Sequence, residues 1–358
     1  MKNIERLMSM IPDTIDAVLI TSDINRRYFT GMSSSAGTVL CFRDAFYFII
    51  DFRYIEKAMK CVKDFTVIEQ RNLYTQISSL MQQHNAKTLA IESKMMTLYE
   101  LSQLEERLEE DINLVVDNAL SNLIDDCRII KSEREINCIR EAQRLAETAL
   151  EKVLNWIHVG ATEREIQLKL DFTMLELGAE SLSFPTIALT GSRTSMPHGV
   201  PSPDAVVRDN SFVLMDFGAV VDGYHSDMTR TVCIGKPTDY MEIIYNIVLK
   251  AQEACLNKIK SGMTGKDIDE IARRIISDEG YGENFGHSLG HGVGMEIHEL
   301  PNASPSSLAV LQSGNVVTVE PGIYLPDKFG VRIEDFVVVH ENGCENLTKA
   351  PKKLQIID

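Results

Sequence analysis

The chain has 358 residues, of which 44% are hydrophobic and 25% are charged, and its formal net charge at pH 7 is −16. This length suffices for two domains of ordinary size, and the composition is typical of a globular protein. The negative charge argues against nucleic acid or an anionic membrane as a partner, because both attract basic surfaces. No apolar run reaches the length of a membrane span. Seven scattered cysteines without a C-x-x-C motif predict reduced thiols and a cytoplasmic protein.

Residues 1 to about 125 alternate short apolar runs with segments of helical spacing, which predicts an α/β domain. The expected strands are 16–20, 37–42, 46–50, 65–68, 88–91 and 112–116, and the expected helices lie near 53–62, 73–83 and 97–109. We find no catalytic constellation in this part of the sequence. A domain boundary is expected near 125–128, so that the second domain spans 126–358.

Two amphipathic helices are predicted at the start of the second domain. Ser132 and Glu135 fit a capping box, and apolar residues then recur every three or four positions as far as Ile157. Thr162 and Glu165 fit a second capping box, which opens a helix ending near Gly178. Further strands are expected at 186–189, 211–215, 316–319 and 337–339, and further helices at 238–260 and 264–276.

The second domain contains an internal repeat. The pattern G-x-T-x-x-E-I at 160–166 matches G-x-T-x-x-D-I at 262–268, and D-x-G-A at 216–219 matches E-x-G-I at 320–323. Each match is weak alone, but together they predict two related halves of about 100 residues. We therefore expect a pseudo-two-fold domain with its functional site between the halves.

Three of the eight histidines, His287, His291 and His298, lie within twelve residues among four glycines. So many glycines disfavour a helix and suit a backbone that passes close to a ligand or another strand. On an extended segment His287 and His291 would face the same way, whereas His298 would face the other way unless the chain bends. Neutral imidazole binds metals and transfers protons near neutral pH. The alternative interpretation is a glycine-rich loop with structural histidines.

Four carboxylates stand at or near the ends of apolar runs. Asp216 ends one run, and Asp227 follows eleven residues later, a gap that suits a hairpin. Glu320 ends a run in the second half, and Glu334 follows fourteen residues later. Charged residues in such runs are rarely buried unless paired or bound to metal, and their symmetric placement argues against ordinary surface acids. With His291 they suit a pair of divalent ions, which can activate water for hydrolysis at neutral pH.

At these residues the chain resembles the pita-bread metallopeptidases, which include methionine aminopeptidase, aminopeptidase P, prolidase and the creatinase-like proteins. The stretch 287–299 fits the signature of the proline-peptidase branch, and the stretches 216–231, 318–324 and 332–335 fit other blocks of the family. The first 125 residues resemble the additional domain of aminopeptidase P, prolidase and creatinase. The resemblance implies an α/β (α+β) fold, with a creatinase-like domain at 1–125 and a pita-bread catalytic domain at 126–358.

The resemblance also implies two divalent metal ions, with Mn²⁺ favoured and Co²⁺ or Zn²⁺ as alternatives. The five implied ligands are Asp216, Asp227, His291, Glu320 and Glu334. Asp216 would chelate one ion, while His291 and Glu320 would hold the other. Asp227 and Glu334 would bridge the pair, and Arg332 would support these ligands without binding metal.

The implied reaction is hydrolysis of the bond between an N-terminal residue and proline, in X-Pro dipeptides or short X-Pro peptides, by a homodimer. Its four implied catalytic residues are His198, His287, His298 and Glu320. Glu320 would shuttle the proton, His298 would face the scissile carbonyl oxygen, and His198 would assist the leaving nitrogen. His287 would line the site.

Two other functions are compatible with the sequence: a creatinase-like hydrolase that cleaves a C–N bond without metal, and a non-enzymatic peptide-binding module of the same fold. Retention of all five ligands argues against both. Substrate length is a separate question, because a dipeptidase must hold the free carboxylate of its product proline. Arg193, five residues before His198, is the candidate cation for that role, and a solvated loop arginine is the alternative.

Overall fold

The computed structural model describes residues 2–357, and the chain divides into two compact units, Met1–Arg128 and Ile129–Asp358. Each unit has a hydrophobic core of its own. Among the residues described, no helix is both long and apolar enough to cross a membrane.

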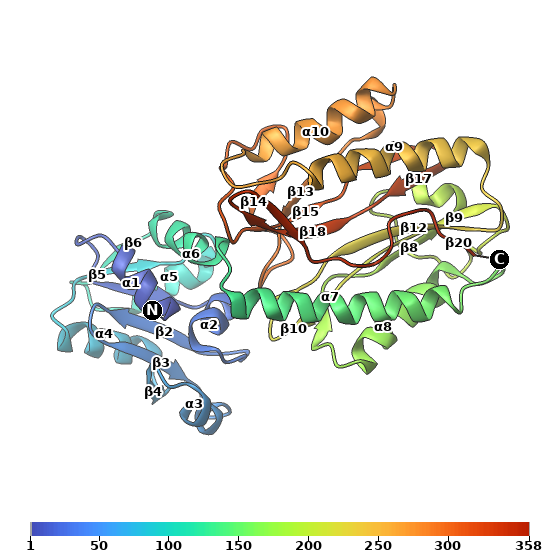
Figure 1. Ribbon diagram of the computed structural model, residues 1–358. Coiled ribbons are helices and arrows are strands. Elements are labelled where there is room, and N and C mark those ends of the chain that lie inside the picture. Colours follow the sequence, from blue (N-terminus) through green and yellow to red (C-terminus); the bar gives the residue numbers. More distant parts are fainter. Residues whose placement is uncertain (1, 358) are drawn as a thin grey trace. The chain divides into compact units, whose positions relative to one another are not determined.

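The first unit is built on a six-stranded mixed sheet (Figure 1). Its strands are β1 Ala17–Ile20, β2 Thr38–Phe42, β3 Phe46–Ile50, β4 Thr66–Glu69, β5 Thr88–Ile91 and β6 Asn113–Val115. Its helices are α1 Asn3–Met10, α2 Asp23–Thr30, α3 Ile55–Cys61, α4 Leu73–Gln83, α5 Leu98–Arg107 and α6 Ala119–Ile129. The strand order is β4-β3-β2-β1-β5-β6, and Ile77 of α4 and Leu104 of α5 join the core of the sheet.

The six strands and the helices α3, α4 and α5 agree with the sequence-based prediction, whereas α1, α2 and α6 were not predicted. Helix α6 runs through residue 125, where we expected the boundary, and continues to Ile129.

The second unit has four long helices, α7 Glu133–Leu154, α8 Glu163–Glu176, α9 Asp239–Leu256 and α10 Gly265–Asp278. Two short 3-10 helices are η1 Gly191–Ser195 and η2 Gly282–Asn284. The strands of its first half, with the C-terminal strand, are β7 Ser181–Leu182, β8 Ile187–Thr190, β9 Ser211–Phe217, β10 Ala219–Val221, β11 Tyr224–His225, β12 Met228–Ile234 and β20 Ile356–Ile357. Those of its second half are β13 Gly290–Gly292, β14 Glu299–Ala303, β15 Val316–Val319, β16 Gly322–Leu325, β17 Phe329–Arg332, β18 Asp335–His340 and β19 Gly343–Asn346.

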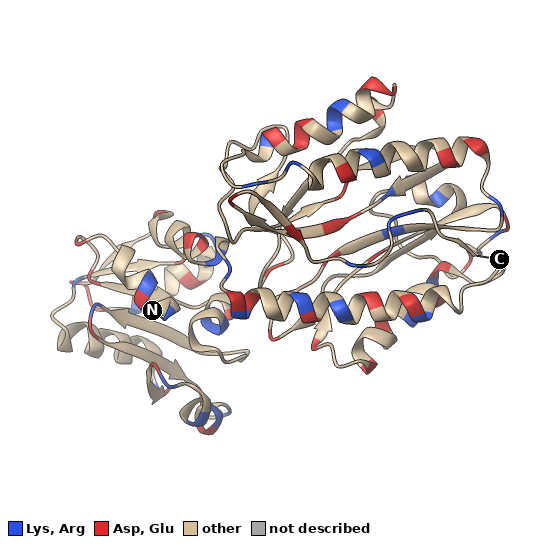
Figure 2. Ribbon diagram, in the orientation of Figure 1, with Lys and Arg blue, Asp and Glu red and all other residues tan. Residues whose placement is uncertain are grey.

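The strands of this unit lie between two helical layers, α9 with α10 on one side and α7 with α8 on the other (Figure 1). The larger sheets have the orders β20-β12-β9-β8 and β14-β13-β15-β18-β19. Helices α7 and α8 bury Leu145 and Ile166 against β9 and β12, and α9 and α10 bury Ile244 and Ile268 against β15 and β18. The outer surface of α7 alternates acidic and basic residues, as a solvated helix face does (Figure 2).

The two halves share local structure as well as sequence. Thr162 and Thr264 cap α8 and α10 with capping boxes, and each forms an isolated bridge to a later segment, Thr162 to Val206 and Thr264 to Val310. Glycines 160 and 262 precede these caps with φ values of 94° and 91°, which only glycine adopts readily. The repeat predicted from the sequence is therefore a repeat of structure.

Candidate active site

The first pair of carboxylates is brought together by the hairpin that the sequence predicts. Strands β9 and β12 are antiparallel, with Asp216 opposite Thr229. Asp227 lies two residues before Thr229, and residues two apart on an extended chain point to the same face. Asp216 and Asp227 therefore converge on one side of the sheet.

A second hairpin brings the other pair of carboxylates, Glu320 and Glu334, together. Strands β16 and β17 are antiparallel with Gly322 opposite Arg332, so Glu320 and Glu334 flank the open end of this hairpin. Glu334 is also tied to the first half, because its main-chain N–H donates to Thr229 O at 3.1 Å. The two halves thus deliver their carboxylates to a common place.

Ligand atoms of Asp227, His291 and Glu334 lie within 4.8 Å of one another. His291 Nε2 is 3.5 Å from Asp227 Oδ2 and 3.5 Å from Glu320 Oε1. Asp216 Oδ2 accepts from Arg332 Nη2 at 2.5 Å, whereas Asp216 Oδ1 is buried without a hydrogen-bond partner. An orphaned carboxylate oxygen beside three converging ligand atoms fits a divalent ion.

The tautomer of His291 follows from its neighbours. Its Nδ1 lies 3.0 Å from Gly292 O, and because a carbonyl oxygen can only accept, Nδ1 carries the proton. Nε2 then presents its lone pair to the carboxylates, which is the form that binds a metal. Burial lowers the pKa of His291 to about 4, so the ring is neutral at neutral pH.

The carboxylates repel one another in the absence of a counter-charge. Burial, and after it the neighbouring Asp216 and Glu320 carboxylates, raise the pKa of Asp227 well above its usual value. The pKa of Glu334 is raised well above its usual value by burial and then by Asp227. Burial raises the pKa of Glu320 to about 8, although Arg332 opposes the rise. A site that keeps these groups ionised at neutral pH needs added positive charge, which divalent ions supply.

The three other histidines singled out in the sequence, His198, His287 and His298, lie around this cluster. The His298 ring meets the His291 ring edge-on at 4.4 Å between centroids, because the chain turns between β13 and β14, and it is exposed to the cavity. His198 is exposed on the cavity wall. His287 also lines the cavity, but both its nitrogens are engaged, Nδ1 with Ser288 O at 2.8 Å and Nε2 with Tyr324 Oη at 2.9 Å.

The five predicted ligands, Arg332 and the three other histidines line one cavity of about 700 Å³. Its apolar wall is formed by Phe184, Pro185, Ile187, Pro197, Pro201 and Ile297. An apolar wall beside a cluster of carboxylates and histidines suits a small ligand with one polar, reactive end.

Comparison with known proteins identifies this arrangement. Residues 137–341 match the metallopeptidase family M24, and residues 5–130 match the creatinase/prolidase N-terminal domain. The chain belongs to metallopeptidase family M24. The resemblance and the pita-bread fold inferred from the sequence are thereby confirmed, and membership implies a dinuclear divalent metal centre, for which Asp227, His291 and Glu334 are the candidate core.

This M24 chain is similar over nearly its whole length to proteins named for two activities. It is 37% identical to a Xaa-Pro dipeptidase of Pyrococcus furiosus, covering 99% of each chain. Among solved structures it is similar to a Xaa-Pro dipeptidase from Bacillus anthracis, with 40% identity, a TM-score of 0.94 and 99% of each chain covered. It is also similar to an X-Pro aminopeptidase from Thermotoga maritima, with 37% identity, a TM-score of 0.92 and coverage of 98% of this chain and 100% of the other.

Two threonines of the M24 site were missed by the sequence analysis. Thr229 Oγ1 donates to Glu334 Oε2 at 2.7 Å, and Thr318 Oγ1 donates to Glu320 Oε1 at 3.1 Å. Each lies two residues from a predicted ligand on an extended chain, and that spacing could have identified them. Tyr324 was missed as well, and the sequence carries no comparable signal for it.

Among the residues that the structure describes, Arg193 does not line the cavity, but it contacts Val200, which does. Its Nε pairs with Glu163 Oε1 and Oε2 at 2.9 and 3.0 Å, and its Nη2 donates to Val200 O at 2.7 Å. The Glu163 side chain is fully buried and also accepts from the main-chain N–H groups of Thr190 and Ser202, each at 2.9 Å. Arg193 therefore fastens the loop that carries His198.

The carboxylate cluster makes the stability of the metal-stripped M24 chain depend on pH. A carboxyl whose pKa is higher in the folded than in the unfolded chain binds more protons when folded, so stability falls as pH rises between the two values. Glu320, with a folded pKa of about 8, acts in this way up to about pH 8. The pKa values of His287 and His291 are lowered to about 4, so these residues make stability rise as pH rises from about 4 to 6.5. Above pH 6.5 they add no further change.

We therefore expect the metal-stripped protein to lose stability between about pH 6.5 and 8, by up to about 1.4 kcal/mol per pH unit for each such carboxyl. Urea unfolding followed by the fluorescence of Trp156 measures this effect, because the single tryptophan lies in the second unit. Mn²⁺-loaded protein is the control, since bound ions keep the carboxylates ionised. Constant or rising stability of the stripped protein over this range would contradict the prediction.

Proposed function

We propose that the chain hydrolyses the bond between an N-terminal residue and proline in X-Pro dipeptides or short X-Pro peptides. The observation that carries the proposal is one cavity in which an apolar wall adjoins the carboxylate and histidine cluster. The wall suits the pyrrolidine ring of proline. The tertiary X–Pro amide has no N–H, so the wall can crowd its nitrogen without leaving a donor unpaired. The names of the dipeptidase and aminopeptidase relatives support the same substrate class.

Two divalent ions, when bound, would activate water and polarise the scissile carbonyl. We propose that Asp216, Asp227, His291, Glu320 and Glu334 hold them. Glu320 would take up the proton of the attacking water and return it to the leaving nitrogen. The exposed His298 donates an N–H to the developing oxyanion, and His198 assists the imino nitrogen from the cavity wall.

The two alternatives are disfavoured by the same cluster. A metal-free C–N hydrolase would leave Asp216 Oδ1 buried without a partner and several carboxylates in mutual repulsion. A binding module would have no use for this arrangement, because burying charge without compensation is costly.

Peptide hydrolysis in the presence of different metals tests the proposal. Metal-stripped protein is assayed with Ala-Pro, Ala-Pro-Ala and their Ala-Ala counterparts in Mn²⁺, Co²⁺ and Zn²⁺. We expect cleavage of the X-Pro bond alone, restored by metal, with Mn²⁺ favoured. Cleavage of the Ala-Ala peptides at equal rates, or full activity without metal, would refute it.

Substrate length depends on a cation that can meet the peptide carboxylate. Arg332 lines the cavity but is 4% exposed and engaged with Asp216 and Tyr324. Arg164 lines the same cavity from the first turn of α8, and its exposed side chain donates to Gln167 Oε1 at 2.7 Å. We propose Arg164, rather than Arg193, as the residue that binds the carboxylate of the substrate.

Peptide acids and their C-terminal amides separate the two arginines. Arg164→Gln should lower kcat/KM for the acid by about 10-fold and leave the amide unchanged, because a charge-assisted bond is lost at an exposed, screened site. Arg193→Gln should slow both forms equally, since it loosens the loop of His198. If Arg164→Gln lowers kcat/KM for the dipeptide acid, the chain acts as a dipeptidase. If it does so only for longer peptide acids, the chain acts as an aminopeptidase. Equal effects of Arg164→Gln on acid and amide would rule out its assignment.

We propose a creatinase-like domain at 1–125 and a catalytic domain at 126–358, a homodimer, and a cytoplasmic location.

A further inference from the structure

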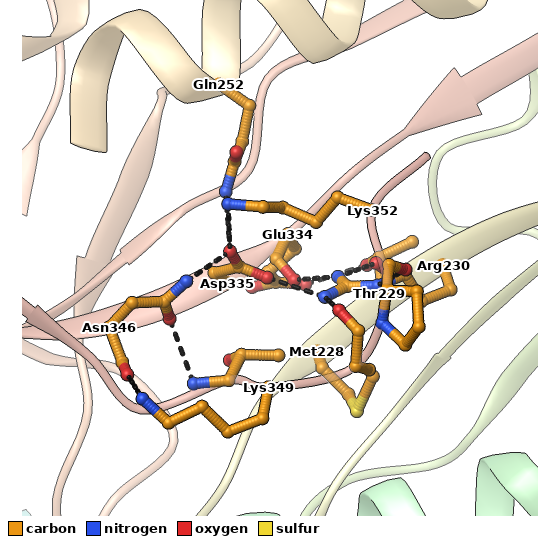
Figure 3. A network of polar contacts seen from close by, with 12 residues as sticks. Met228, Thr229, Arg230, Gln252, Glu334, Asp335, Asn346, Lys349 and Lys352 are labelled. Carbon is orange, nitrogen blue, oxygen red and sulfur yellow. Dashed lines mark hydrogen bonds and ion pairs between the residues drawn. The ribbon is translucent and has the colours of Figure 1, made fainter. Parts of the chain in front are cut away.

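Arg230 lies next to the carboxylate cluster, and 2% of its side chain is exposed. A guanidinium has five N–H donors, and here each has an acceptor within 3.0 Å. The acceptors are the main-chain oxygens of Thr229, Glu334, Ala350 and Pro351 and the side-chain Asp335 Oδ1 (Figure 3). Arg230 thus joins three segments that are remote in sequence.

Asp335 completes this arrangement. Its side chain is fully buried, with Oδ1 on Arg230 at 2.7 Å. Its Oδ2 accepts from Gln252 Nε2 at 3.0 Å and Asn346 Nδ2 at 2.7 Å, and pairs with Lys352 Nζ at 3.0 Å (Figure 3). Two cations, Arg230 and Lys352, and two side-chain amides therefore fix a buried carboxylate that immediately follows Glu334 in the chain.

Glu334 is held on both sides by these contacts. Its carbonyl accepts from Arg230 Nη1 at 2.6 Å, and its N–H donates to Thr229 O at 3.1 Å. Its carboxylate accepts from Thr229 Oγ1 at 2.7 Å. The direction in which the Glu334 carboxylate points is therefore set by Arg230, Thr229 and Asp335 together.

The C-terminal segment 350–352 closes the network from the other side. Ala350 and Pro351 supply two of the carbonyls that hold Arg230, and Lys352 supplies the second cation beside Asp335. Lys352 is anchored in turn, because its carbonyl accepts from Tyr245 Oη at 2.8 Å. The segment therefore contacts Arg230, which binds the Glu334 carbonyl, and Asp335, which follows Glu334 in the chain.

We propose that segment 350–352 positions Glu334 and thereby sets the metal affinity of the centre, with Lys352 as the positioning residue. The inference rests on the proposed function in one respect, because it takes Glu334 to be a metal ligand. Groups that orient a ligand from behind typically change metal affinity by about 10–100-fold when they are removed.

Two adjacent lysines provide the test. Lys352 contacts Asp335, whereas Lys353 is exposed, so Lys352→Met and Lys353→Met remove the same charge from neighbouring positions. Calorimetric titration of the metal-stripped full chain with Mn²⁺ should show affinity lowered by about 10-fold or more in Lys352→Met. Lys353→Met should stay within about 2-fold of wild type, and Lys352→Arg should restore most of the affinity.

Hydrolysis of Ala-Pro separates positioning from general damage. In Lys352→Met the Mn²⁺ concentration for half-maximal activity should rise, while kcat at saturating Mn²⁺ stays near wild type. Asn346→Ala removes another donor from the same Asp335 oxygen and should weaken Mn²⁺ binding in the same direction, which keeps the test available if Lys352→Met does not fold.

The outcomes distinguish this inference from the proposed function. Wild-type Mn²⁺ affinity in both Lys352→Met and Asn346→Ala, with X-Pro cleavage intact, would overturn the inference alone. Weakened Mn²⁺ binding in these variants, with no X-Pro cleavage by the wild type, would overturn the proposed substrate and support the inference. A wild-type chain that binds no Mn²⁺, Co²⁺ or Zn²⁺ would overturn both.

Discussion

Replacing Asp227 with asparagine, or Glu334 with glutamine, is expected to remove at least one metal ion and to abolish peptide hydrolysis. Both substitutions keep the shape of the side chain and remove its charge. Ligand atoms of these two residues and His291 lie within 4.8 Å of one another, and we propose that both carboxylates bridge the two ions. An amide retains one oxygen but cannot balance two divalent charges in a buried site.

Metal analysis after dialysis measures this effect. We expect about two ions per chain in the wild type and one or none in either variant. Glu341→Gln is the matched control, because Glu341 is exposed in the turn between β18 and β19. Two bound ions and measurable hydrolysis in Glu334→Gln would show that Glu334 is no bridge.

The second large effect is expected from His298→Ala, which should lower kcat by about 10²–10³ without changing the metal content. His298 is exposed to the cavity and meets the His291 ring at 4.4 Å, so it reaches the region where the scissile carbonyl would bind. Its loss removes a donor that acts on the transition state and leaves every proposed ligand in place. Such a change lowers kcat and kcat/KM together.

Steady-state kinetics of Ala-Pro hydrolysis with parallel metal analysis checks this prediction. His340→Ala serves as the control, because His340 is exposed at the end of β18. An unchanged kcat for His298→Ala would make His298 a structural residue, and lost metal would make it a ligand.

Much of the fold was predictable from the sequence because its signals are local. The capping boxes at Thr162 and Thr264 start helices at the expected residues, and apolar runs mark the strands. Helix α2 was missed because its residues show little apolar periodicity. Its Arg26 is 3% exposed and donates to Asp23 and to Ser34 O, so tertiary contacts bury a residue that the sequence marks as solvated.

The convergence of site residues was predictable where they lie on neighbouring strands of one hairpin. It was not predictable where residues distant in the sequence contact each other. Asp216 and Asp227 come together through one hairpin. Arg193, in contrast, is engaged by Glu163, thirty residues earlier and fully buried, and no local pattern announces such a pair. The bend that brings His298 back to His291 was likewise only one of two options that the extended pattern allowed.

The central claim is that the carboxylates and His291 hold two metal ions. Anomalous diffraction from crystals grown with Mn²⁺ tests it most directly. We expect two manganese peaks about 3.5–4 Å apart, with Asp227 and Glu334 bound to both, Asp216 to one, and His291 and Glu320 to the other. A single peak, or peaks bound to other residues, would contradict it.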